Sequence, residues 1–237
     1  MVGIANGMGS RMDILKSRNE AKTSFFLIFL IGYIYMDYLY EQELIKNGFN
    51  DICGIDEAGR GPLAGPLVAG AVILDSNNLD VLVDLKESKS LSEAQREFYF
   101  DIVCHNVKSW SVGVVSNKEL DKHGLSYANK IVMKRAWYYL DVKPDYILYD
   151  YMPGVQFETP AKGIKKGDKN ILSIAAASII AKVIHDRIMH SFARIYPKYG
   201  FDQHKGYGTK FHLDKIQEFG ACPIHRTSYK GVKSTLL

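Results

Sequence analysis

Residues 52–66 read ICGIDEAGRGPLAGP and combine a short apolar run, two adjacent carboxylates and a turn rich in glycine and proline. The apolar residues Ile52 to Ile55 predict part of a buried strand. Asp56 and Glu57 follow where we expect this strand to open into the turn. Because neighbouring strand residues point to opposite faces, both carboxylates can reach one metal ion only if the backbone turns there. Two acidic oxygen donors at a strand end suit a hard divalent cation, magnesium or manganese.

The turn itself offers groups that can contact a ligand. Gly59 and Gly61 have no side chain, so their backbone can approach a ligand closely, and Arg60 between them can meet a phosphate. An isolated Asp-Glu pair is more often an ordinary surface turn with an N-cap acid. The dense glycine and proline pattern between two apolar runs makes this stretch more specific, and we interpret it as a candidate site.

Composition places the chain among ordinary globular proteins. Its 237 residues suffice for one domain with a substantial core, and 47% hydrophobic with 24% charged residues is the usual balance. The net charge of +4 is compatible with a polyanionic partner without establishing one. The three cysteines, Cys53, Cys104 and Cys222, have neither a disulfide framework nor a zinc spacing, which favours a reducing, cytoplasmic location.

The N-terminal residues differ from the rest. We expect residues 1–35 to be an extension and residues 36–237 to form the domain. The run Phe25 to Met36 is apolar or aromatic but shorter than the roughly 20 residues of a spanning helix. Basic residues precede it as in a signal peptide, but no small-residue cleavage site follows. A misassigned start, with Met36 as the true one, is the favoured interpretation, ahead of a disordered or loosely packed tail and of membrane association.

Hydrophobic patterns predict alternating strands and helices after the opening stretch. Strands are expected at Leu67–Leu74, antiparallel to the first strand, at Trp110–Val115 and at Tyr146–Tyr149. Helices are expected at Tyr38–Lys46, Glu93–Cys104, Tyr127–Leu140, Ile171–Met189 and Lys210–Phe219. Ser92 and Gln95 have the spacing of a capping box. Helices between the later strands favour an α/β fold with a mixed sheet.

Two further acids lie at element ends. Asp150 directly follows the apolar run Tyr146–Tyr149, and Asp168 lies near the start of the long helix, where a carboxylate is favoured. Taken alone, the first is a common turn acid and the second an N-cap. Asp186, inside the same helix, is best explained by an i,i+4 contact with Lys182.

The C-terminal part contains two basic turns. Tyr207, within HKGYGT at residues 204–209, is an aromatic side chain between basic residues and glycines, which can stack on a sugar or base; the alternative is a capping turn before the next helix. The turn PIHR at residues 223–226 can meet backbone phosphates, or it can be a solvated loop.

Taken together, these motifs resemble the ribonuclease HII family over about residues 38–230. The resemblance is carried by IDEAGRGPLAGP, ESKSLS, the acid after YILY, KKGD, SIAAASIIAKV, HKGYGT and PIHR, which occur in the family's order. It implies an α/β ribonuclease H-like fold with a mixed central sheet flanked by helices and a C-terminal helical segment.

The resemblance also implies roles for individual residues. The four carboxylates that would carry catalysis and bind Mn²⁺ or Mg²⁺ match Asp56, Glu57, Asp150 and Asp168. The residues that would bind substrate match Gly59, Arg60 and Gly61, which read the ribose 2′-hydroxyl, Lys89, which contacts a phosphate, and Tyr207, which stacks on the sugar of the following deoxynucleotide. The chain departs from the family pattern at Tyr151, where glycine is usual, and at Ser90, where a second lysine is usual.

The implied activity is endonucleolytic. The enzyme would hydrolyse the RNA strand of RNA–DNA hybrids and nick 5′ of ribonucleotides embedded in duplex DNA, leaving a 5′-phosphate and a 3′-hydroxyl by two-metal catalysis. Ribonucleotide excision and RNA primer removal during DNA replication are the implied roles. We expect a monomer without an obligate protein partner or a membrane. The alternatives are a non-catalytic hybrid-binding protein with a metal site altered by Tyr151, and a membrane-associated nuclease anchored by Phe25 to Met36. Ribonuclease HIII is disfavoured because its substantial N-terminal domain is missing.

Overall fold

The computed structural model describes residues 38–82, 85 and 88–233, which belong to the compact unit Met36–Leu237. The expected extension of residues 1–35, the apolar run Phe25 to Met36 and the alternatives that depend on them lie outside the described residues. Among the helices that are described, none combines the length and the apolar character needed to cross a membrane.

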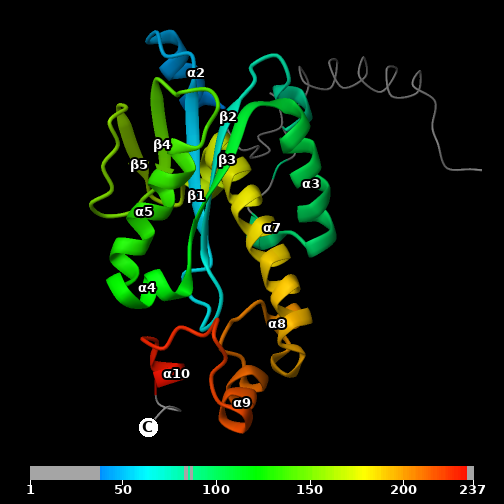
Figure 1. Ribbon diagram of the computed structural model, residues 1–237. Helices are drawn as coiled ribbons and strands as arrows, with labels where there is room; N and C mark the ends of the chain where they lie inside the picture. Colours follow the sequence, from blue (N-terminus) through cyan, green and yellow to red (C-terminus); the bar gives the residue numbers. More distant parts are fainter. Residues whose placement is uncertain (1–37, 83–84, 86–87, 234–237) are drawn as a thin grey trace, which may run out of the picture. The chain divides into compact units, whose positions relative to one another are not determined.

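A five-stranded mixed sheet forms the centre of the unit (Figure 1). The strands are β1 (Ile52–Ala58), β2 (Leu67–Leu74), β3 (Val107–Val115), β4 (Tyr146–Asp150) and β5 (Ala161–Ile164), in the order β3-β2-β1-β4-β5. β1 pairs antiparallel with β2, as expected, and parallel with β4, where Ile55 lies opposite Tyr149. This register brings the carboxyl ends of β1 and β4 to the same edge of the sheet.

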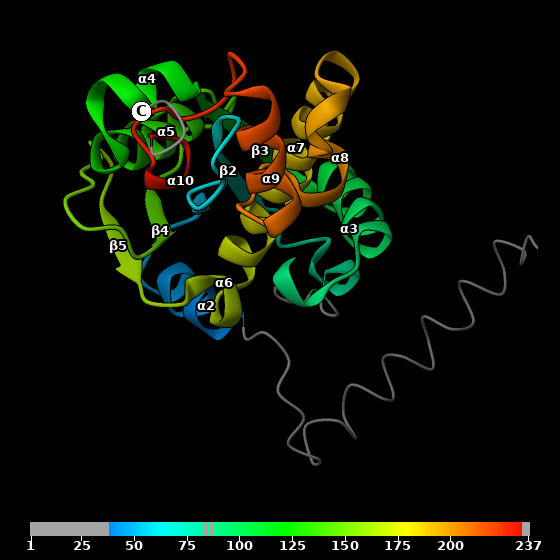
Figure 2. The same ribbon diagram turned by 90° about the horizontal axis from the view of Figure 1, so that it is seen from below.

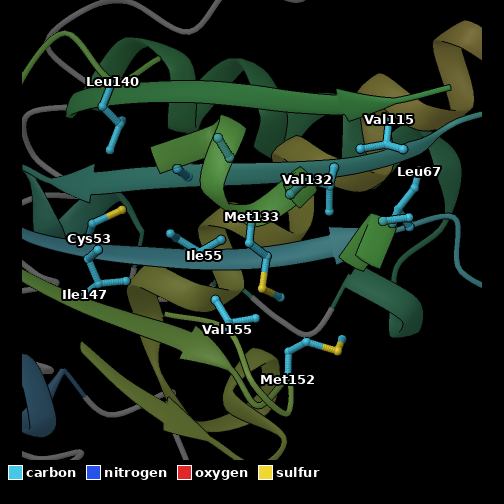
Figure 3. Packing of buried hydrophobic residues seen from close by; sticks show 14 of the residues in the cluster. Cys53, Ile55, Leu67, Val115, Val132, Met133, Leu140, Ile147, Met152 and Val155 are labelled. Atoms are coloured by element: carbon cyan, nitrogen blue, oxygen red, sulfur yellow. The ribbon is translucent and has the colours of Figure 1, made fainter. Parts of the chain in front are cut away.

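Helices cover both faces of the sheet. The α-helices are α2 (Leu39–Lys46), α3 (Glu93–Asn106), α4 (Asn117–His123), α5 (Leu125–Tyr138), α6 (Gly167–Asn170), α7 (Leu172–Ile195), α8 (Phe201–His204), α9 (Lys210–Phe219) and α10 (Lys230–Lys233). In both views α3 and α7 lie on one side of the sheet and α4 and α5 on the other (Figures 1 and 2). Figure 3 shows the core on the α5 side, where Ile55 and Ile147 of the sheet meet Val132 and Met133 of α5.

Close contact between α7 and the sheet depends on small residues. A Cβ atom at Gly54 would lie 2.1 Å from the Ser173 carbonyl carbon, and one at Gly70 would lie 2.3 Å from the Ala177 carbonyl oxygen. Ala175, Ala176 and Ala177 are fully buried in this contact. The backbone of α7 therefore lies almost directly against β1 and β2.

The ends of the helices agree in part with the sequence analysis. The expected capping box of Ser92 and Gln95 is present. Ser116 caps α4, because its side chain accepts a hydrogen bond from the Glu119 amide. α5 spans Leu125–Tyr138, two residues earlier at each end than the expected Tyr127–Leu140.

Candidate active site

Asp56 and Glu57 lie inside β1 and not after it. The strand remains paired through Ala58, with Asp56 opposite Gly70 and Glu57 opposite Ala69, so the expected turn at the two acids is wrong. The backbone turns at Gly59, which has a φ of +95° that favours glycine. Asp56 Oδ1 accepts a hydrogen bond from the Glu57 amide at 2.8 Å.

Asp150 and Asp168 reach the same edge of the sheet. Asp150 ends β4 and directly follows Tyr149, which lies opposite Ile55 in the parallel register. Its Oδ1 accepts a hydrogen bond of 2.9 Å from the amide of Gly167, the first residue of α6. Asp168 lies buried in that first turn. Asp168 therefore belongs to a separate four-residue helix before the long helix, and Asp150 anchors that helix.

Tyr151 leaves the position of Asp150 intact. Its amide donates a hydrogen bond of 3.0 Å to the Ile164 carbonyl, and its ring is 47% exposed, so the bulky side chain is accommodated at the surface. Asp150 retains its place in the strand.

Burial and mutual repulsion raise the pKa values of three of the acids, Asp56, Glu57 and Asp150. Burial raises the pKa of Asp56 well above its usual range, and the negative charges of Glu57 and Asp150 raise it further. Burial raises the pKa of Glu57 to about 7, with Arg60 opposing and Asp150 adding to the rise. Burial also raises the pKa of Asp150, and the charge of Asp168 contributes. The four acids therefore lie close enough together for their negative charges to repel one another.

Two side-chain cations partly neutralise this cluster. Lys89 Nζ lies 3.1 Å from Asp168 Oδ2, and Arg60 Nη1 lies 3.2 Å from Glu57 Oε1. Both cationic side chains are at least half exposed, so each can swing away. Within the described residues, no three His, Cys, Asp or Glu side chains are placed so that they could hold one metal ion.

The donor set nevertheless fits divalent metal ions. Glu57 Oε2 is buried and has no hydrogen-bond partner among the residues that the structure describes, which is costly for a carboxylate oxygen unless another ligand satisfies it. All four acids supply the oxygen donors that hard cations prefer. Movement of Lys89 and Arg60 out of the cluster would leave these oxygens available.

The glycine turn and Tyr207 form one continuous surface beside the acids. A Cβ atom at Gly61 would lie 3.4 Å from the Tyr207 ring. The ring is 43% exposed, and Lys182 Nζ lies 5.9 Å from its centroid. The structure thus brings together the two segments that were expected to bind substrate, although 146 positions separate Gly61 from Tyr207.

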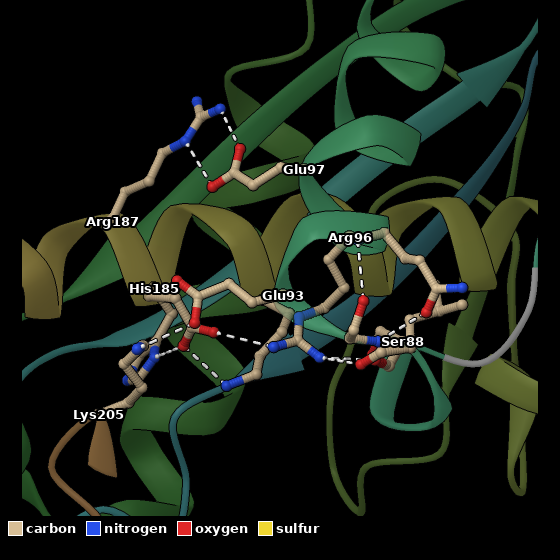
Figure 4. Close-up of polar contacts among 12 residues, drawn as sticks. Ser88, Glu93, Arg96, Glu97, His185, Arg187 and Lys205 are labelled. Carbon is tan, nitrogen blue, oxygen red and sulfur yellow. Dashed lines mark hydrogen bonds and ion pairs between the residues drawn. The ribbon is translucent and has the colours of Figure 1, made fainter. Parts of the chain in front are cut away.

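A polar network joins α3 to α7 (Figure 4). Asp186 contacts Lys182 at 2.7 Å, as expected, but it also contacts Arg96 at 3.6 Å and His185 at 3.2 Å. Although burial alone would raise it, the hydrogen bonds from His185 and Lys182 hold the pKa of Asp186 below its usual value. The predicted i,i+4 contact of Asp186 with Lys182 is therefore confirmed.

Two serines of this region were missed by the sequence analysis. Ser88 Oγ lies 2.8 Å from Ser178 Oγ on α7, and a hydrogen bond from Ser178 lowers the pKa of Asp56 against the effect of burial. Arg96 holds the same turn by donating to the Ser88 carbonyl at 3.3 Å. Ser88 and Ser178 thus connect the turn that carries Lys89 with Asp56. Only their presence in the quoted motifs could have drawn attention to them.

Three of the four residues in the turn PIHR are buried, and Pro223 alone is exposed. His225 and Arg226 are 1% and 0% exposed, so the interpretation that this turn meets phosphates, and the alternative of a solvated loop, are both wrong. Lys205 in the other basic turn is also buried, and its ammonium group lies 3.2 Å from Glu93 Oε2.

Comparisons with known proteins agree with this geometry. The family model described as Ribonuclease HII matches residues 53–232. The ribonuclease HII of Listeria innocua is 43% identical over 84% of this chain and 75% of its own length. That of Acetivibrio thermocellus is 43% identical over 93% of this chain and 85% of its own length.

Solved structures share the fold. The ribonuclease H2 of Pyrococcus horikoshii superposes with a TM-score of 0.68 at 28% identity, covering 78% of this chain and 97% of that one. The ribonuclease HII of Archaeoglobus fulgidus, solved in complex with PCNA, gives a TM-score of 0.63 at 25% identity, with the same coverage of both chains. A ribonuclease HIII in complex with Mn²⁺ matches at 18% identity and a TM-score of 0.59, which shows the fold alone.

The expected ribonuclease H-like fold is thereby confirmed, and the comparisons support an endonuclease and not the non-catalytic hybrid-binding alternative. The matched segment contains all four acids, the glycine turn and Tyr207. The chain therefore belongs to the ribonuclease HII family and is a ribonuclease H.

Proposed function

We propose that the chain hydrolyses the RNA strand of RNA–DNA hybrids and nicks duplex DNA on the 5′ side of embedded ribonucleotides. The observation that carries this proposal is the convergence of Asp56, Glu57, Asp150 and Asp168 at one sheet edge, beside a glycine turn and an exposed tyrosine. Removal of embedded ribonucleotides and of RNA primers during DNA replication would use this activity.

The four carboxylates would hold the divalent metal, Mn²⁺ or Mg²⁺. When bound in pairs, such ions lower the pKa of water and stabilise charge on the attacking and leaving oxygens of a phosphodiester. Asp56 and Glu57 lie in the last three residues of β1 and Asp150 ends β4, while Glu57 and Asp168 form ion pairs with Arg60 and Lys89. The products would be a 5′-phosphate and a 3′-hydroxyl.

Substrate recognition would use the surface beside the acids. The backbone of Gly59 and Gly61 can approach a 2′-hydroxyl, which is the group that distinguishes RNA from DNA. The Tyr207 ring against Gly61 offers an exposed face on which a sugar can stack. Arg60 and Lys89 carry exposed cations that can move from carboxylate to phosphate once metal ions neutralise the acids.

The remaining expectations belong to the same proposal. Residues 36–237 would form the catalytic domain with its C-terminal substrate-binding helical part, and residues 1–35 an N-terminal extension. The enzyme would act in the cytoplasm as a monomer without an obligate protein partner. The Archaeoglobus relative binds PCNA, so size-exclusion chromatography alone and with a sliding clamp tests the last point.

The decisive experiment uses a labelled DNA duplex with a single ribonucleotide, incubated with Mn²⁺ and then with Mg²⁺. We expect cleavage 5′ of the ribonucleotide by the unaltered chain and its loss in Asp150→Asn. Asp214→Asn, which removes an exposed acid of α9, is the matched control and should cleave normally. Binding without cleavage in either metal would contradict the proposal and make Tyr151→Gly the next variant to test.

A further inference from the structure

Arg226 is a buried cation whose hydrogen bonds converge on one loop. Its side chain is 0% exposed, and a guanidinium group has five N–H donors. All five are used: Nε donates to the Gly65 carbonyl (3.0 Å), Nη1 to the Arg60 carbonyl (3.1 Å) and the Tyr229 hydroxyl (3.2 Å), and Nη2 to the carbonyls of Gly59 (2.6 Å) and Pro66 (2.9 Å). None of the five acceptors is a carboxylate, so the charge is solvated by main-chain oxygens.

The four carbonyl acceptors define the path of residues 59–66. Two of them, on Gly59 and Arg60, belong to the peptide groups that directly precede Arg60 and Gly61. A rigid planar guanidinium group that bonds to both fixes the orientation of these peptide planes. The loop that would read the 2′-hydroxyl is therefore shaped by a side chain 160 or more positions away in the sequence.

Tyr229 makes a second tie to the same loop. Its hydroxyl donates to the Arg60 carbonyl at 2.8 Å while it accepts from Arg226. The main chain adds two bonds, from the Arg226 amide to the Leu63 carbonyl at 2.8 Å and from the Gly65 amide to the Ile224 carbonyl at 2.9 Å. The segment Cys222–Tyr229 thus follows one side of the glycine loop.

The same segment is tied to Tyr207 through two neutral histidines. Because the Cys222 amide donates to His225 Nδ1 at 2.8 Å, His225 carries its proton on Nε2 and donates it to His212 Nε2 at 3.1 Å. His212 then holds its proton on Nδ1 and donates to the Tyr207 carbonyl at 2.9 Å. The Tyr207 carbonyl is thus held by two successive hydrogen bonds that lead back to His225, the residue next to Arg226.

We infer that the segment Cys222–Tyr229 positions both recognition elements of the active site. Arg226 and Tyr229 orient the Gly59–Gly61 peptides, and His225 acts through His212 on Tyr207. One rigid segment then sets the spacing between the group that reads the 2′-hydroxyl and the ring that stacks on the next sugar. This inference rests on the proposed function, because it assigns positioning residues to that function. Arg226 and His225 are too deeply buried to touch substrate themselves.

Discrimination between ribose and deoxyribose is the measurement that tests the inference. Fluorescence anisotropy in the Asp150→Asn background with Mn²⁺ gives Kd for a duplex with one ribonucleotide and for the same duplex made only of DNA. We expect the ratio of the two Kd values to fall about tenfold in Arg226→Lys, whose ammonium group has three donors for five acceptors, and about threefold in Tyr229→Phe. The matched controls Arg194→Lys and Tyr138→Phe, both at exposed positions, should keep the original ratio.

The link from His225 through His212 to Tyr207 has its own rescue test. The amide nitrogen of Asn can occupy the place of a histidine Nδ1, so His212→Asn should keep the bond to the Tyr207 carbonyl but lose the bond from His225, and the ratio should fall by less than in the alanine variant. His212→Ala should lower the ratio about threefold.

The outcomes separate the inference from the function on which it rests. Circular dichroism melting first shows which variants fold. If Arg226→Lys does not fold, the inference is tested with Tyr229→Phe, which loses only one hydroxyl group. Folded variants with lowered melting temperatures but an unchanged ratio would reduce the segment to ordinary structural support and overturn the inference. A ratio of one in the parent protein would overturn the proposed recognition itself.

Discussion

Binding of Mn²⁺ should depend steeply on pH because Glu57 binds a proton near neutrality. Its pKa is raised to about 7 by burial, and a carboxyl group must lose its proton to ligate a metal. Roughly one tenth of Glu57 is ionised at pH 6 and roughly nine tenths at pH 8. The affinity of the chain for Mn²⁺ should therefore rise about tenfold over this range, equivalent to about 1.4 kcal/mol. The raised pKa of Asp56 acts in the same direction.

Isothermal titration calorimetry can measure both the affinity and the protons released. Titrations in buffers of different ionisation enthalpy should show close to one proton released from Glu57 per chain at pH 6, and fewer at pH 8. In Glu57→Gln the part of the pH dependence that centres near 7 should disappear. In Arg60→Met it should move to higher pH, because the guanidinium charge now lowers the pKa of Glu57. An affinity that stays constant from pH 6 to pH 8 would refute the idea that metal and proton compete for this carboxylate.

Three other perturbations give clear outcomes. Gly70→Ala should destabilise the fold by about 1–3 kcal/mol in urea unfolding, because the new Cβ would lie 2.3 Å from the Ala177 carbonyl oxygen. Acidification from pH 6.5 towards pH 4 should destabilise the fold. Burial lowers the pKa of both His212 and His225 to about 4, so the unfolded state binds more protons than the folded state in this pH range. After allowance for solvent screening, this should cost about 2–3 kcal/mol for the pair, measured as a fall in Tm. Tyr151→Gly should leave kcat within about threefold of the parent value, because the strand contact of residue 151 is made by its backbone, and a larger loss would assign the ring a role in catalysis.

The parts of the fold that the sequence predicted are those with strong local patterns. The buried strand Leu67–Leu74 and the helix Lys210–Phe219 have the expected bounds, because continuous apolar runs and clear capping residues specify them locally. β5 was missed, since Ala161–Ile164 is short, half exposed and without alternation. It becomes a strand only because β4 offers it a parallel partner.

The candidate site also has parts that the local sequence predicts and parts that depend on the folded structure. The four acids could be identified because each follows an apolar run or precedes a helix within a recognisable motif. Their mutual approach could not be derived locally, because it depends on the parallel register of β1 and β4 and on the bond from Gly167 to Asp150. The ion pairs of Lys89 and Arg60 with the acids also arise only after folding.

The burial of Arg226 has a cause that can be traced to a different part of the chain. Residues 59–66 contain two prolines and three glycines, a composition that resists continued sheet pairing beyond β1 and leaves carbonyl groups without ladder partners. Buried carbonyls need donors, and a guanidinium group supplies five in one plane. An arginine side chain normally lies in water. Arg226 is buried because the carbonyl groups of this loop accept its hydrogen bonds in the interior. A loop rich in glycine and proline next to a buried strand therefore indicates that its carbonyl groups need hydrogen-bond donors from elsewhere in the chain. In this chain Arg226 supplies them.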